Sequence, residues 1–220
     1  MFGQYDIGFL CELLFYARDH NGLHIVKECS TIDSRHICRG NWQTTAAISY
    51  LCHLSSIATP DGAHAPELYH LLSSTLTKIT ITDKSHRNIA AHSLWFELQL
   101  LNIQGLPPQL NRCTSCDMSI TTSLNMLFSA TEGGVVCSNC HASGRAKDCQ
   151  QLSGDTLAIL RRIQSASDFI MLQAIRISKI QQNQMQQLLG AFLTYHLDLS
   201  PSCRSVAYRM FGIEPMKSKP

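Results

Sequence analysis

The pattern of apolar and polar positions begins with a stretch that predicts two β-strands. Residues 9–17 are rich in apolar and aromatic side chains, and residues 23–32 alternate in part between apolar and polar positions. Asn21-Gly22 stands between them, and this dipeptide favours the two-residue turn of a β-hairpin. Because an isolated hairpin is at best marginally stable, the strands are expected to pack on the rest of the chain or to belong to a larger sheet.

From about residue 41 the spacing of the apolar positions becomes helical. The first predicted helix places four side chains on one face: Trp42, Ala46, Tyr50 and Leu54. A Thr-Pro-Asp-Gly segment ends it. A second helix is expected to begin at Pro66, because proline suits the first helical turn.

A third, long helix is expected to precede the cysteine-rich region. Asp83 is its predicted N-cap, and Gly105 marks its end. Its apolar stripe consists of Ile89, His92, Phe96 and Leu100. His92, like His53 and His70, is interpreted as an ordinary histidine on an apolar face, because nothing pairs these residues at a ligand spacing.

Two helices are predicted after the cysteine-rich region. One runs through residues 153–163, with Ser153 or Asp155 as its N-cap. The other spans about residues 180–197, and its inward side chains are Met185, Leu188, Leu189, Phe192 and Leu193. The glutamine-rich stretch at 181–187 is expected to be a solvated face. Together these patterns predict a mainly α fold.

Composition places the chain among globular proteins. It has 220 residues, of which 45% are hydrophobic and 15% charged. No basic segment precedes an apolar run at the beginning, and no apolar run is long enough to span a membrane, so a soluble cytoplasmic protein is expected. Residues 1–150 carry a net charge of −2 and residues 151–220 a net charge of +4, which an ordinary solvated surface could also explain.

Four of the ten cysteines form two Cys-x-x-Cys pairs, Cys113/Cys116 and Cys137/Cys140, with 20 residues between them. A Cys-x-x-Cys turn lets two thiolates reach one ion, and two such turns complete a tetrahedron around zinc. Gly133-Gly134 suits the tight turn before the second pair. Because four thiolates leave no open coordination position, the sequence predicts one structural zinc ion rather than a catalytic one.

Three alternatives exist for these cysteines. Disulfides are disfavoured in a reducing cytosol, and a thioredoxin-like redox centre would leave the second pair unexplained. The segment Cys137-Ser138-Asn139-Cys140-His141 also satisfies the pattern of c-type haem attachment. An electron-transfer haem protein that uses Cys137, Cys140 and His141 would need export and would leave Cys113 and Cys116 without a role.

A series of short motifs follows in order from residue 96 to residue 211. They are Phe96-Glu97-Leu98-x-Leu100-Leu101, Gly105-Leu106-Pro107-Pro108-x-Leu110, Arg112-Cys113-x-x-Cys116, Phe128-Ser129-x-x-x-Gly133-Gly134-x-x-Cys137-x-x-Cys140, Leu152-Ser153-x-x-Thr156-Leu157, Phe192-Leu193-x-Tyr195-His196-Leu197, Arg204-Ser205 and Phe211. This order resembles the RecO family of bacterial DNA-repair proteins. The resemblance covers about residues 9–211 and is most specific at 96–157.

The resemblance implies a fold as well as a function. RecO-like proteins have an N-terminal OB-fold barrel, followed by a helical domain with an inserted zinc module. In this chain, residues 1–35 are therefore expected to be the last strands of a barrel that is mostly missing. Residues 36–220 are expected to form the helical domain, with a four-cysteine zinc module at 111–148.

The family resemblance further implies a recombination mediator rather than an enzyme. Such proteins bind single- and double-stranded DNA, partner RecR, and contact the C-terminal tail of single-stranded-DNA-binding protein. They load RecA and anneal complementary strands, without a small-molecule substrate or a membrane, in the bacterial cytoplasm at repair sites on the nucleoid. The alternative is a zinc-stapled protein–protein adaptor that does not bind DNA.

Basic side chains in the C-terminal third are the candidates for DNA or partner-tail binding, because phosphates and an acidic tail both need cations. They are Arg161, Arg162, Arg176, Lys179, Arg204 and Arg209. Each of them could equally belong to ordinary solvated surface. The chain departs from the family at Leu94-Trp95, where a basic residue often stands, so the expected positive charge on that helix is weaker.

Overall fold

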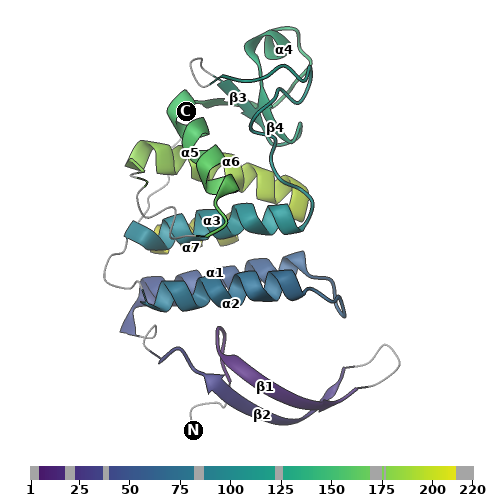
Figure 1. Ribbon diagram of the computed structural model, residues 1–220, viewed down its shortest axis with the longest axis vertical. Helices are drawn as coiled ribbons and strands as arrows, with labels where there is room; N and C mark the ends of the chain where they lie inside the picture. The colour runs from purple at the N-terminus through teal and green to yellow at the C-terminus, as the bar shows by residue number, and fades with distance from the viewer. Residues whose placement is uncertain are drawn as a thin grey trace.

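A computed structural model describes residues 5–17, 23–36, 40–81, 87–121, 126–168, 175 and 177–211. Figure 1 shows an elongated stack, with a β-ribbon at one end and a small cysteine-bearing module at the other. Seven helices in the described residues are α1 (Trp42–Ala58), α2 (Pro66–Ile81), α3 (Arg87–Ile103), α4 (Ser138–Ala142), α5 (Gly154–Ser165), α6 (Lys179–Leu197) and α7 (Pro201–Met210). The chain is therefore mainly helical.

The predicted pairing of two N-terminal strands is confirmed, whereas the predicted Asn21-Gly22 turn lies outside the described residues. β1 (Leu10–Tyr16) pairs antiparallel with β2 (Ile25–Asp33), and no third strand joins them in the described part of the chain. Both strands leave large apolar side chains exposed, among them Leu14, Phe15 and Ile32. The assignment of this ribbon to the end of an OB-fold barrel stays a prediction.

The first three helices form as the apolar spacing predicts. The Asn41 side chain caps α1 by accepting hydrogen bonds from two backbone N–H groups, and α2 begins at Pro66. The spacing places Trp42 on the buried face of α1, but it is 59% exposed because it occupies the first helical position, at the end of the packed face. Gly105 ends α3 with φ +71°, whereas Asp83 lies outside the described residues.

The buried core follows the helices. α1 packs against α2, α3 and α7, while α5 packs against both α3 and α6. The largest fully buried side chains of this core are Phe96, Phe128, Phe192, Leu51, Leu54 and Leu94. Within the described residues, no helix combines the length and the apolar character that crossing a membrane requires.

In the second half of the chain, the structure corrects one prediction and adds one helix that the sequence pattern does not predict. Ser153 caps α5, and the Ser178 and Gln181 side chains form a capping box at the start of α6. The glutamine-rich stretch of α6 is only partly solvated, because Asn183 and Gln186 are 7% and 8% exposed. α7, a helix of ten residues that the sequence analysis does not predict, packs on both α1 and α6.

A three-stranded sheet, also absent from the sequence prediction, carries the cysteine module. β3 (Met126–Ser129) lies between β4 (Gly134–Val136) and β5 (Cys149–Leu152), with antiparallel pairing on both sides. Strands of three or four residues are too short to show an alternating pattern. β3 also packs on α6 and α4, so the sheet joins the module to the helical core.

Candidate metal centre and basic residues

The first cysteine pair lies in the loop that follows α3. The Cys113 backbone N–H donates to the Met118 carbonyl at 2.9 Å, and the Asp117 N–H donates to the Cys113 carbonyl at 2.9 Å. Asp117 adopts a left-handed conformation, with φ 59°, which closes this turn. The turn therefore brings the Cys116 thiol back beside that of Cys113.

The second pair follows the tight turn between β3 and β4. Cys137 caps α4, and its Sγ accepts a hydrogen bond from the Cys140 backbone N–H. Gly133 has φ +82°, as the predicted turn requires. The Val135 N–H donates to the Gln109 carbonyl at 2.8 Å, so backbone hydrogen bonds hold the loop of the first pair against the hairpin of the second.

Gly134 is the position where this contact tolerates no side chain. A Cβ there would lie 2.2 Å from the Gln109 carbonyl oxygen, which is backbone and cannot rotate away. A Gly134→Ala substitution is expected to destabilise the protein by about 2 kcal/mol or more, measured by urea unfolding.

Gly133→Ala is the control for that prediction. It introduces a methyl group one residue earlier, where nothing lies within 4 Å of the added Cβ. Its cost should be limited to that of a positive φ, about 1 kcal/mol. Equal losses of stability in the two variants would contradict the close contact at Gln109.

All four thiols converge on one point. Their sulfur atoms lie within 4.8 Å of one another, and the Sγ atoms of Cys116 and Cys137 are 3.8 Å apart. A tetrahedral zinc ion with sulfur ligands at about 2.3 Å requires edges of about 3.8 Å. Three of the thiols are buried, and only Cys116 is exposed. The residues therefore form a site that could hold a metal ion with four thiolate ligands.

The thiols of the cluster differ in their pKa values. Burial raises the pKa of Cys113, but hydrogen bonds, led by that from the Cys137 backbone N–H, lower it to about 6. Burial and hydrogen bonds with the other three thiols raise the pKa of Cys140 to about 12. Four thiolates can therefore coexist at neutral pH only around a cation, because each deprotonation makes the next more costly.

The alternatives to a metal site are less compatible with this geometry. The cysteine thiols of the cluster are free, and 3.8 Å is far beyond the length of a disulfide bond. His141 is exposed and does not belong to the group of converging ligand atoms. A covalently attached haem would use Cys137 and Cys140 without Cys113 and Cys116, whereas here all four sulfur atoms meet.

Two of the candidate basic residues have their hydrogen-bonding groups turned inward. The Arg161 guanidinium donates to the Leu110 carbonyl at 2.7 and 2.9 Å and to the Ile120 carbonyl at 2.8 Å. It thereby ties α5 to the loop around the first cysteine pair, and burial lowers its pKa. Arg204 is 6% exposed and lies in the helical core.

The other candidates differ in exposure. Arg162, Lys179 and Arg209 are exposed, on α5, at the start of α6 and on α7 respectively. These three form no ion pair with the described residues. Arg176 lies outside the described residues. The exposed cations are therefore the ones available to an anionic partner.

A buried cluster around Glu97 joins residues that the sequence does not mark as a unit. Glu97 is 0% exposed, and its carboxylate accepts from Arg204 at 2.7 and 2.9 Å, from the Tyr50 hydroxyl at 2.6 Å and from the Tyr208 hydroxyl at 2.9 Å. Arg204 also donates to the Gln186 carbonyl at 2.5 Å. A carboxylate in the middle of the apolar stretch of α3 is the signal that could have revealed it. Four helices thus meet at one charged pair.

Electrostatics keep the Arg204 guanidinium charged. Burial by itself lowers the pKa of Arg204, but the adjacent Glu97 carboxylate more than offsets this and raises it well above its usual value. Burial, reinforced by Glu97, raises the pKa values of Tyr50 and Tyr208, so both hydroxyls stay protonated as donors. The cluster is therefore a structural tie rather than a proton-transfer site.

Comparison with known proteins identifies a family over most of the chain. A family profile described as "Recombination protein O C terminal" matches residues 39–203. The chain is 28% identical over 194 residues to the DNA repair protein RecO of Dehalococcoides mccartyi, covering 86% of this chain and 73% of that protein. It is 27% identical over 184 residues to the protein of the same name from Pelotomaculum thermopropionicum, covering 84% and 68%. It is 28% identical over 200 residues to the DNA repair protein RecO of Roseiflexus sp., covering 91% of this chain and 67% of that protein.

Proposed function

The chain belongs to the RecO family of DNA repair proteins, and from this premise we propose that it is a recombination mediator that acts by binding DNA and partner proteins. The observation that carries the proposal is the family match over residues 39–203, which includes all four cysteines and most of the helical core. In this proposal the chain transforms no small-molecule substrate. It works in the bacterial cytoplasm at repair sites on the nucleoid.

We propose that residues 111–148 form a module held by one structural zinc ion. The four converging thiols of Cys113, Cys116, Cys137 and Cys140 support this, because thiolates at tetrahedral spacing prefer zinc. Zinc would supply a fixed cross-link between the loop after α3 and the β3–β4 hairpin. With all four positions taken by sulfur, the proposed ion leaves no site for a substrate.

DNA binding is proposed for the exposed cations. Arg162, Lys179 and Arg209 are open to solvent, so a phosphate can replace their counterions at little structural cost. Arg176 remains in the proposed set, whereas Arg161 and Arg204 would support the fold behind this surface. The proposed ligands are single- and double-stranded DNA, because contacts with the phosphate backbone do not depend on strandedness.

The finer functions follow the family and are proposals for this chain. They are contact with the acidic C-terminal tail of single-stranded-DNA-binding protein, partnership with RecR, annealing of complementary strands and loading of RecA. A second candidate is an adaptor that binds these proteins but not DNA. The exposed two-stranded ribbon favours this candidate, because in the described residues it does not close into a barrel that could hold a strand.

The two candidates are separated by the salt dependence of DNA binding. A variant that combines Arg162→Ala, Lys179→Ala and Arg209→Ala is expected to bind a fluorescent oligonucleotide more weakly. Its salt slope should be smaller by roughly one for each phosphate that the variant no longer neutralises. Fluorescence anisotropy over a range of salt concentrations measures both quantities. Annealing of oligonucleotides coated with the cognate single-stranded-DNA-binding protein measures the function itself.

The matched control keeps the charge at each position, with Arg162→Lys, Lys179→Arg and Arg209→Lys in one chain. Phosphate binding depends mainly on charge, so this control should keep most of the affinity and the slope. If the wild-type protein does not bind DNA but still binds the tail of single-stranded-DNA-binding protein, the adaptor function is correct and the mediator function is not. If the alanine variant keeps the salt dependence of the wild-type protein, these three residues do not contact DNA.

A further inference from the structure

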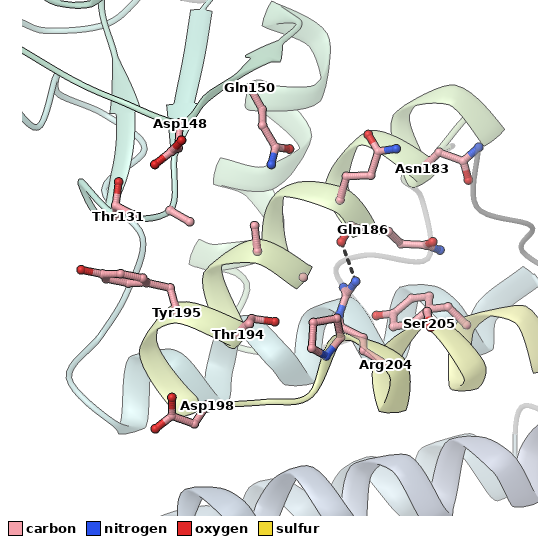
Figure 2. Close-up of a pocket in the computed structure, with 16 residues that line it drawn as sticks. Thr131, Asp148, Gln150, Asn183, Gln186, Thr194, Tyr195, Asp198, Arg204 and Ser205 are labelled. Atoms are coloured by element: carbon pink, nitrogen blue, oxygen red, sulfur yellow. Dashed lines mark hydrogen bonds between the residues drawn. The ribbon is translucent and has the colours of Figure 1, made fainter. Parts of the chain in front are cut away.

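A cavity of about 810 Å³ opens where the cysteine module meets the C-terminal helices. Figure 2 shows its walls: Thr131 at the β3–β4 turn, Asp148 and Gln150 at the start of β5, the face of α6, and Ser205 on α7. Its lining on α6 runs from Asn183 to Tyr195, and Asp198 follows directly after the helix. At 1.5 Å per residue the length on α6 is about 18 Å, which matches an extended peptide of five or six residues.

Two buried side chains in this cavity have polar atoms without partners. Oδ1 of Asn183 and Nε2 of Gln186 make no hydrogen bond within the described part of the chain, although both residues are more than nine-tenths buried. Leaving such a buried polar atom without a hydrogen bond destabilises the protein. The neighbouring Gln184 shows the contrast, because its amide donates to the Gln151 carbonyl at 2.7 Å.

The two unpaired atoms are complementary to a polypeptide backbone. Residues three apart on a helix lie side by side, so Asn183 offers an acceptor next to the donor of Gln186. An extended peptide presents N–H and C=O groups at this spacing, and it can fill the rest of the cavity with apolar side chains. Ala191, Pro201 and Tyr208 supply apolar lining.

The charged side chains that line the cavity favour some peptides over others. Asp148 and Asp198 line the cavity, and Asp148 is exposed; neither forms an ion pair with the described residues. Arg204 is the cation of the lining, and its charge is already balanced by Glu97 at 2.7 Å. An acidic peptide or a nucleic acid would bring anions toward two uncompensated carboxylates.

We propose that this cavity binds a short extended segment of a partner protein that carries a Lys or Arg and has no net negative charge. The unpaired atoms of Asn183 and Gln186 are covered in this structure, so both side chains would rotate to pair with its backbone. Either Asp148 or Asp198, which Figure 2 draws well apart, would pair with its cation. The site differs in location and charge from the exposed basic residues, so it stands independently of the proposed function. It would give the protein a second protein contact with the opposite electrostatic preference.

The test uses three pools of N-acetylated, C-amidated hexapeptides that differ at one fixed position, occupied by Lys, Gln or Glu. The readout is the side-chain amide NMR signal of Gln186 in the full chain, assigned with the Gln186→Leu variant. The Lys pool is expected to shift this signal at the lowest concentration. One exposed ion pair with Lys, together with the charge repulsion that Glu would meet, predicts an advantage of about fivefold to tenfold over the Glu pool.

Asp148→Asn combined with Asp198→Asn gives the matched variant. Both aspartates have φ 52°, a conformation that asparagine also tolerates, so the fold should persist while the charge is removed. In this variant the Lys and Gln pools are expected to bind equally. The proposal is overturned if no pool shifts the signal, if the Glu pool binds as well as the Lys pool, or if oligo(dT) shifts the signal instead.

Discussion

A Cys140→Ser variant is expected to lose its metal and, with it, the ordered structure of residues 111–148. Metal binding to a four-thiolate site contributes folding free energy on the order of 10 kcal/mol, which is comparable with the total stability of a domain. Zinc content measured by mass spectrometry under reducing conditions should fall from one ion per chain toward zero. The urea midpoint should fall with it, and chelation of the wild-type protein should have the same effect.

Cys149→Ser is the control for this experiment. Cys149 lies on β5, close to the module, but its thiol does not belong to the converging cluster. The substitution is expected to leave both zinc content and the midpoint near wild-type values. Two results together would contradict this prediction: no zinc is found in the purified wild-type protein, and chelators leave its stability unchanged. The four thiols would then act only as buried side chains.

A Glu97→Ala variant is expected to destabilise the helical domain by about 3–5 kcal/mol, because it leaves the Arg204 charge buried without a partner. The two side chains are 0% and 7% exposed, so solvent cannot take the place of the carboxylate. Two tyrosine hydroxyls would lose their acceptor in the same step. Urea unfolding followed by circular dichroism measures the change in stability.

The paired substitution separates the ion pair from simple packing. Glu97→Leu combined with Arg204→Met removes both charges while keeping most of the side-chain volume, so it should cost less than the sum of the two single variants. A coupling energy of about 2 kcal/mol or more is expected. Strict additivity would mean that each side chain contributes on its own and that the pair is not a structural unit.

Much of this architecture could be predicted from the sequence, for reasons that particular residues make clear. Met185, Leu188, Leu189, Phe192 and Leu193 repeat at helical spacing, and all five are buried. Cys-x-x-Cys spacing places two thiols on one turn wherever it occurs. These signals are local, so they do not require knowledge of what lies nearby in space.

The remaining features depend on contacts between distant segments. Gln186 has the character of a surface residue, yet it is 8% exposed in the folded protein. Arg204 resembles a surface cation in the sequence, because nothing near it marks Glu97, 107 residues earlier, as its partner. The strands β3 to β5 are too short to reveal a period. In each case the environment, rather than the residue itself, decides its role.

The tie between Glu97 and Arg204 also bears on when the protein can fold during its synthesis. The core carboxylate on α3 leaves the ribosome long before its arginine, and Tyr208 follows later still. Until then a charged group at the centre of the helical layer has no cation, which opposes compaction around α3. Completion of this core is therefore expected only after α7 has been synthesised, so that chains stalled before α7 stay open to chaperones and proteases.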